Sequence, residues 1–134
     1  MKRINPSTLT QTVTDLISQI VIIPASPLAF ISGQVALNEK GELIGKGDYL
    51  LQARQVFANL KLALEAIDTE AKSIVQMRIY VVNHKPEWID SIFQAGFEVF
   101  GEGWPKTAST FIGVQALAYK EWLIEVDAMA SISN

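Results

Sequence analysis

Two acidic residues near the C-terminus, Glu125 and Asp127, have the type and spacing that acid–base chemistry needs. Residues 107–130 predict two strands around a short turn. Alternate side chains of a strand share a face, so both acids project to one side, roughly 6.5 Å apart along the chain. Glu125 lies in an otherwise apolar stretch, where limited solvent would raise its pKa and poise it to orient or deprotonate a water. The alternative is that both acids form the solvent face of an amphipathic strand, and the sequence alone favours it.

The preceding strand offers a second polar group, Ser109, in the run T-A-S-T-F-I-G-V. The two-residue period places Ser109 on one face with Phe111 and Gly113, while Thr110 projects to the other. A catalytic serine needs a histidine partner, and the single histidine, His84, has no G-x-S-x-G element beside it. The sequence therefore offers no serine triad built on Ser109.

The residue inventory argues against several other chemistries. The chain has no cysteine, which excludes disulfides and thiolate catalysis, and a zinc site around His84 would need an unusual set of carboxylate ligands. We expect no metal site and place His84 in a surface turn. No phosphate-binding glycine loop opens a helix after a strand. A net charge of −3, a pI near 5.1 and scattered basic residues disfavour nucleic-acid binding.

Composition favours one domain, residues 1–134, that forms an oligomer. Hydrophobic residues make up 49% of the chain and charged residues only 19%, which is apolar for a small soluble monomer. No apolar run approaches the roughly 18 residues of a membrane span, and no apolar signal-peptide segment follows the N-terminal basic residues. We expect a cytoplasmic protein without a membrane partner, whose apolar surplus is buried in a subunit interface.

Changes in hydrophobic period predict the order β-β-α-β-α-β-β and an α/β (α+β) class, with two helices on one face of a mixed sheet. The first two β-type runs suit a hairpin because a short Pro-containing segment separates them. Polar helix residues Gln52, Arg54 and Asn59 are expected on a solvated or subunit-facing side. The predicted strands cover residues 19–24, 28–33, 73–83 and two segments within 107–130; the predicted helices begin after the N-cap Asp48 and at Pro86, with a loop over 38–48.

Four short motifs occur in order along nearly the whole chain. They are S-G-Q at 32–34, Q-A-R-Q-V-F-A-N at 52–59, R-I-Y-V at 78–81 and I-E-V-D-A at 124–128. They resemble, respectively, the S-G-Q, Q-x-R-x-x-x-N, central-strand and I/V-E-I/V-E-A motifs of the YjgF-like, or Rid (reactive intermediate deaminase), family. Each motif is weak alone, but their order and spacing together are specific.

The resemblance implies a chorismate-mutase-like (YjgF-like) fold and a homotrimer with ligand clefts between subunits. The two helices leave the other face of the sheet uncovered, and that face would then line the trimer interior. Deaminating members hydrolyse 2-imino and 2-enamino acids to 2-keto acids and ammonia, and the protein brings no cofactor. In those members an arginine clamps the substrate carboxylate, and a glutamate that matches Glu125 positions the attacking water.

The chain departs from the deaminating members at the clamp, where Ser109 (or Thr110, if the turn is gapped differently) replaces the arginine. A neutral hydroxyl lacks the bidentate, charge-assisted grip on a carboxylate and loses about 1.5–3 kcal/mol, roughly 10- to 150-fold in binding. Ile17 stands where many members have a tyrosine. Arg78 is a candidate replacement for the clamp, with a surface or interface ion pair as the alternative. The other candidate binding residues are Ser32, Gly33 and Gln94, the last of which approximates a cleft asparagine of the family.

Two functions stay open. The first is hydrolytic deamination of enamine or imine intermediates with an altered, less anionic substrate preference. The second is a non-catalytic module that binds a small metabolite in the same clefts. Retention of Glu125 favours chemistry, whereas loss of the arginine disfavours the known reaction. RNA cleavage, an older association of the family, is the weakest interpretation because the chain is acidic.

Overall fold

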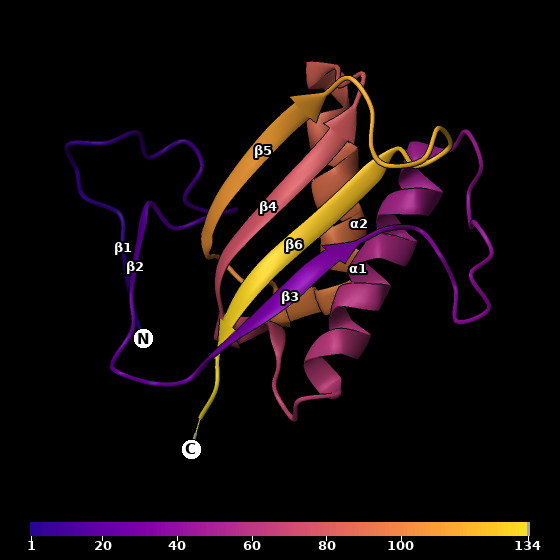
Figure 1. Ribbon diagram of the computed structural model, residues 1–134. Coiled ribbons are helices and arrows are strands. Elements are labelled where there is room, and N and C mark those ends of the chain that lie inside the picture. Colours follow the sequence, from indigo (N-terminus) through magenta and orange to yellow (C-terminus); the bar gives the residue numbers. More distant parts are fainter. Residues whose placement is uncertain (134) are drawn as a thin grey trace.

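A four-stranded mixed sheet backed by two helices forms the body of the protein (Figure 1). The computed structural model describes residues 1–133. The strand order is β3-β6-β4-β5, in which β4 and β5 run parallel and the other pairs are antiparallel. The predicted two-layer arrangement is therefore confirmed. The strands are β3 (Leu28–Gln34), β4 (Ile74–Val82), β5 (Ala108–Val114) and β6 (Ile124–Ser131), the helices are α1 (Tyr49–Glu65) and α2 (Ile89–Phe100), and 3₁₀ turns cover Ala71–Ser73, Pro86–Trp88 and Gly101–Gly103.

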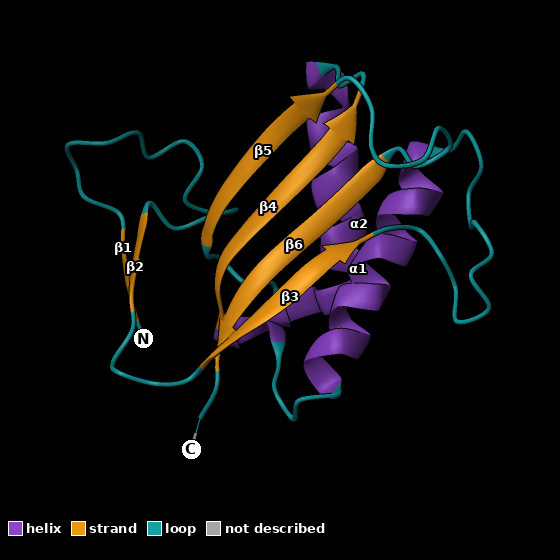
Figure 2. Ribbon diagram, viewed as in Figure 1, coloured by secondary structure: helices purple, strands orange, loops and turns teal. Residues whose placement is uncertain are grey.

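A separate two-stranded ribbon near the N-terminus corrects the predicted hairpin (Figure 2). Strand β1 (Lys2–Ile4) pairs with β2 (Ile20–Ile22), whereas β3 pairs with β6. The prediction that residues 19–24 and 28–33 pair with each other is wrong. Pro24 and Pro27 lack the amides that a continuous ladder would use at this turn, and the eight-residue β6 offers β3 a longer partner.

The two strands predicted within residues 107–130 are present, but they do not pair with each other. Strand β4 lies between β5 and β6, and residues 115–123 connect the two across it. Because β4 and β5 are parallel, their connection has to cross the sheet, and α2 makes that crossing. The register of β5 and β6 against β4 therefore decides on which face of the sheet each candidate site residue lies.

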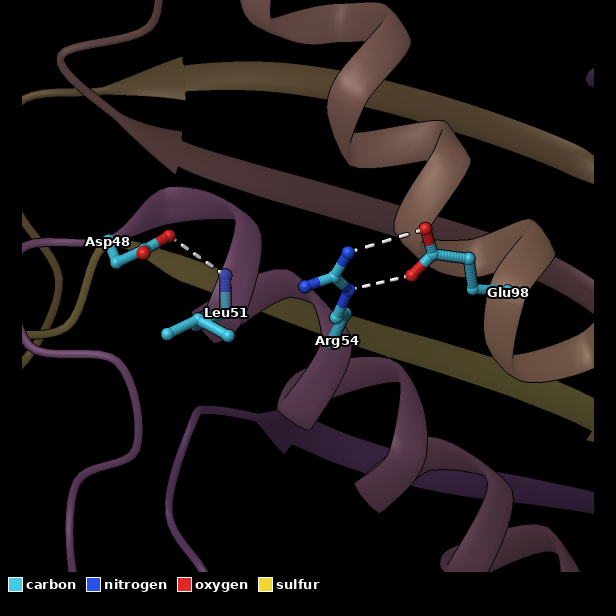
Figure 3. A network of polar contacts seen from close by, with 4 residues as sticks. All are labelled: Asp48, Leu51, Arg54 and Glu98. Atoms are coloured by element: carbon cyan, nitrogen blue, oxygen red, sulfur yellow. Dashed lines mark hydrogen bonds and ion pairs between the residues drawn. The ribbon is translucent and has the colours of Figure 1, made fainter.

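Capping and one ion pair fix the helical layer (Figure 3). The Asp48 carboxylate accepts from the Leu51 amide at 3.0 Å, which confirms Asp48 as the N-cap of α1. Arg54 on α1 donates to Glu98 on α2, with Nε to Oε2 at 2.6 Å and Nη2 to Oε1 at 3.4 Å. This pair lies on the solvated side of both helices, as predicted for Arg54, and it joins them above the core.

Gln52 is fully buried, contrary to the prediction of a solvated position. Its Nε2 donates to the carbonyl oxygens of Gly45 and Glu121 at 3.1 and 3.0 Å, and its Oε1 accepts from the Leu123 amide at 2.9 Å. Asn59 is half-buried and donates to two carbonyls of the loop after β3. These amides satisfy backbone groups of two loops, which explains why polar residues occupy the buried side of α1.

The two helices cover one sheet face and leave the other open (Figure 1). Beneath the helices, Trp104 packs edge-on against Phe57 and Phe93, each at a ring-centroid distance of 5.7 Å. On the open face Phe30 is 75% exposed. Among the described residues, no helix has the length and apolar character needed to cross a bilayer.

Candidate functional site

The sheet register places Glu125 and Asp127 on the open face. On β6, Glu125 is opposite Tyr80 and Asp127 is opposite Arg78 of β4. The intervening pair, Ile79 and Val126, is fully buried under the helices, so the flanking pairs must project to the other side of the sheet. Both acids therefore share one face, as the strand period predicted.

Arg78 and Asp127 form a bidentate ion pair on this face. Arg78 Nε and Nη2 donate to Oδ1 and Oδ2 of Asp127, both at 2.9 Å, and the Tyr80 hydroxyl donates to Oδ2 at 3.3 Å. The carboxylate raises the pKa of Arg78, chiefly through its hydrogen bonds. Burial and then the charge of Asp127 raise the pKa of Tyr80. The guanidinium predicted as a replacement clamp is thus engaged within the chain.

Glu125 lies against the backbone of Gly33. Strand β3 bulges between Ile31 and Gln34, where it pairs with β6, and this irregularity contains Ser32 and Gly33. A Cβ on Gly33 would overlap the Glu125 carboxylate and lie 2.7 Å from Cδ and 2.9 Å from Cγ. An alanine here would therefore force the Glu125 side chain to move. An adjoining cavity of about 340 Å³ is lined by residues including Phe30, Ser32, Gly33, Gln76, Arg78 and Asp127.

The environment of Glu125 disfavours its charged form. The side chain is half-buried, and desolvation is the largest cause of its raised pKa. The negative charge of Asp127, two residues along the same strand, raises it further. This agrees with the raised pKa expected from the apolar sequence around Glu125, and it prepares the carboxyl to exchange a proton with a water.

Ser109 lies on the opposite face of the sheet from Glu125. It is opposite Met77 of β4, a fully buried residue beneath the helices. Its hydroxyl donates to the Thr107 carbonyl at 3.1 Å. The structure therefore does not bring Ser109 and Glu125 together within one chain.

Ser109 and Ile17 do meet, in a cleft at the edge of the helical layer. The cleft has a volume of about 260 Å³ and lies between β5, α2 and the segment that precedes β2. Hydrogen bonds hold that segment: the Ser18 amide donates to the Thr107 carbonyl at 2.9 Å, and Trp104 Nε1 donates to the Leu16 carbonyl at 2.9 Å. The cleft is lined by Val13, Leu16, Ile17, Ile79, Ile89, Phe93, Ser109, Thr110 and Phe111.

Two other candidates lie apart from both cavities. Gln94 is exposed on α2, one helical turn before Glu98. His84 is half-buried rather than a surface residue, with its ring 4.9 Å from that of Phe111. A Cβ on Gly113 would lie 3.1 Å from the His84 Cβ, so the ring packs over this glycine.

Comparison with known proteins decides the family. The family model described as Endoribonuclease L-PSP matches residues 14–132. The chain belongs to the YjgF/Rid family. A RutC family protein from Pyrococcus horikoshii is 32% identical over 108 residues, which cover 81% of this chain and 82% of the relative.

Solved structures of the YjgF/Rid family share this architecture. A Rid family protein of unknown function from Yersinia pestis matches with a TM-score of 0.89 and 42% identity over 98% of both chains. The YjgF gene product of Escherichia coli matches with a TM-score of 0.67 and 27% identity, over 85% of this chain and 86% of that one. The YjgF-like fold predicted from the sequence is therefore confirmed.

Sequence reasoning missed two features of the candidate site in this YjgF/Rid protein. The Arg78–Asp127–Tyr80 network depends on the antiparallel register of β4 and β6. In the sequence, the available signal for that register is the alternation of polar residues on both strands. The contact of Gly33 with Glu125 was also missed. The sequence signal for this contact is a glycine near the end of one strand when the strand paired with it carries a carboxylate.

Proposed function

We propose that this YjgF/Rid protein is a hydrolytic deaminase of enamine or imine intermediates, with a substrate preference altered by Ser109. The observation that carries the proposal is the half-buried Glu125, seated against Gly33 with a raised pKa. A carboxyl with this environment can orient a water and pass a proton between the water and the departing nitrogen. Hydrolysis of an imine needs such a proton transfer and no electron acceptor.

We further propose that the working form is a homotrimer in which two subunits build each cleft. Ser109 and Ile17 open on the helical side of the sheet, whereas Glu125 and Gly33 lie on the open side. One chain cannot present both sets to one small ligand, but neighbouring chains can. The exposed Phe30 on the open face supports burial of that face against another subunit.

Each candidate residue then has a role. Glu125 is the catalytic group. Gly33 and Ser32, in the bulge of β3, position its carboxyl. Ser109 and Ile17 contact the substrate. Arg78 holds Asp127 beside Glu125 and does not bind the substrate. Gln94 has the weakest case because it is exposed and lines neither cavity.

The second candidate function is a small-metabolite-binding module that uses the same inter-subunit clefts without catalysis. The neutral Ser109 favours it, because the carboxylate clamp of the deaminating members is missing. In that case the protein would bind ligands but leave the rate of imine hydrolysis unchanged.

The test is ammonia and keto-acid release from freshly generated 2-aminoacrylate, compared for wild type, Ser109→Arg and Glu125→Ala. We expect weak wild-type turnover, a gain of roughly 10- to 150-fold in Ser109→Arg and a loss of roughly 10²- to 10⁴-fold in Glu125→Ala. Full activity in Glu125→Ala would refute the catalytic role. Inactivity of all three proteins, with ligand binding retained, would favour the binding module.

A further inference from the structure

Among the residues that the structure describes, none with an ionisable side chain lines the cleft that holds Ser109. Seven of its nine lining residues are apolar, and the other two are Ser109 and Thr110. Its volume of about 260 Å³ exceeds the roughly 150 Å³ cavity that holds a benzene molecule in another protein. A branched aliphatic group or an aromatic ring therefore fits this space.

Ser109 presents the wrong polarity for a carboxylate. Its hydroxyl donates to the Thr107 carbonyl at 3.1 Å, and its oxygen lone pairs are left to accept from a ligand. An N–H group of a ligand can donate to this oxygen without breaking that bond, whereas a carboxylate would compete with the Thr107 carbonyl for the single hydroxyl proton. A carboxylate moved from water into this apolar cleft would lose its hydration without gaining a cation.

Arg78 does not supply the missing cation. Two of its nitrogens bind both oxygens of Asp127, and Arg78 projects to the sheet face opposite Ser109. A substrate carboxylate at Arg78 would have to displace Asp127 and leave that carboxylate unpaired. Both sides of the sheet thus disfavour an anionic substrate.

We propose that the Ser109 cleft binds the apolar substituent of an uncharged imine or enamine. This inference rests on the proposed function and narrows its substrate class. Two-electron oxidation of primary amines produces such imines, so a reaction of that class must supply the substrate. Water adds across the C=N bond, and the resulting carbinolamine loses ammonia to leave an aldehyde or ketone. The step consumes one water and needs no oxidant or reductant.

The first test measures binding without catalysis, using the isosteric probes 3-methylbutanamide and 3-methylbutanoate. They share one carbon skeleton and differ at the polar end, where the amide is neutral and has N–H donors. The protein carries ¹³C labels on its isoleucine δ1 methyl groups, of which Ile17, Ile79 and Ile89 line the cleft. The methyl groups of Ile20 and Ile22, on β2 outside the lining set, report non-specific binding.

We expect the amide to shift the cleft methyl signals and to bind roughly 10-fold or more tightly than the carboxylate. Ser109→Arg is expected to reverse this preference. Ser109→Ala is expected to weaken the amide several-fold without strengthening the carboxylate, because it removes the hydrogen-bond acceptor. Equal or tighter wild-type binding of the carboxylate would overturn the proposal, as would amide-induced shifts confined to β2 or absent from the cleft.

A second test separates this inference from the proposed function. A flavin amine oxidase converts 3-methylbutylamine to its imine with oxygen as the electron acceptor, and ammonia release is followed with no nucleophilic trap present. Faster ammonia release is expected with wild type but not with Glu125→Gln. If the amide binds as expected and hydrolysis is not accelerated, the deaminase function fails while the ligand class of the cleft stands.

Discussion

The Glu125 carboxylate occupies the space that a Cβ on Gly33 would fill. This relationship joins β3 to β6 at the bulge and fixes the direction in which the carboxyl projects. The glycine does not serve a left-handed backbone here, since Gly33 has no positive φ. The atoms that an added Cβ would meet here all belong to the acid beside it.

Gly33→Ala is therefore expected to displace Glu125 and to impair imine hydrolysis nearly as much as Glu125→Ala does. Overpacking at this contact is also expected to lower the free energy of unfolding by about 1–3 kcal/mol. Turnover and urea denaturation measure the two effects. Gly103→Ala, in a 3₁₀ turn where an added Cβ would meet nothing within 4 Å, is the matched control and should alter both quantities much less. Normal turnover in Gly33→Ala would show that the position of Glu125 does not matter to the reaction.

Glu125→Gln is expected to stabilise the protein at neutral pH while it removes activity. An acid with a raised pKa in the folded protein binds more protons when folded than when unfolded. Its contribution to stability is full below its unfolded pKa and is lost as pH rises through its folded pKa. In wild type, ionisation of Glu125 thus lowers the free energy of unfolding only where the pH exceeds the ordinary glutamate pKa of 4.5.

Urea denaturation of Glu125→Gln and wild type, at acidic and at neutral pH, measures this difference. We expect the two proteins to converge in acid and the variant to be the more stable at neutral pH. Glu102→Gln, in an exposed 3₁₀ turn, controls for the loss of one negative charge. A variant that is less stable than wild type at neutral pH would contradict the raised pKa.

Most elements of the fold could be predicted from the sequence, but their pairing could not. Periodicity and the Asp48 cap identify α1, and the β-branched run identifies β4, because these signals are local. Pairing is a competition between strands, and the three-residue β2 was assigned to β3 although β6 is the longer partner. The buried Gln52 was missed for a related reason: its partners lie in loops whose positions no local pattern gives.

The candidate site could be predicted residue by residue but not as an arrangement. Alternation correctly placed Glu125 and Asp127 on one face, since that depends on one strand alone. The relation of Ser109 to Glu125 depends on the register of β5 and β6 against β4, which lies between them. Two strands assumed to meet at a short turn could not reveal that these residues lie on opposite faces.

Asp127→Asn and Arg78→Gln are expected to move the pKa of Glu125 in opposite directions. The charge of Asp127 raises that pKa, so its removal should lower it. Loss of Arg78 removes the positive charge that offsets Asp127 and should raise it further. The only other charged or titratable group that faces Glu125 from the neighbouring strands is Tyr80, because β3 carries no ionisable residue.

Carboxyl ¹³C NMR titration of Glu125 measures these shifts directly. The half-exposed ion pair itself should contribute only about 0.2–1 kcal/mol to stability, so both variants should remain folded. Arg54→Gln breaks the comparable bidentate pair with Glu98 in the helical layer and should leave the Glu125 titration unchanged. Shifts of the same sign in both open-face variants would refute this electrostatic coupling.

Phe30→Glu is expected to dissociate the proposed homotrimer. Phe30 is 75% exposed in the single chain and projects from the open sheet face, where a charge buried against another subunit would lack a partner. Sedimentation equilibrium of wild type and variant measures the change in mass. Leu62→Glu is the matched control, because Leu62 is 61% exposed but lies on α1, away from the open sheet face. If clefts need two subunits, the Phe30 variant should also lose imine hydrolysis while its folded monomer keeps the cleft around Ser109. An unchanged mass in Phe30→Glu would place the subunit interface on another surface.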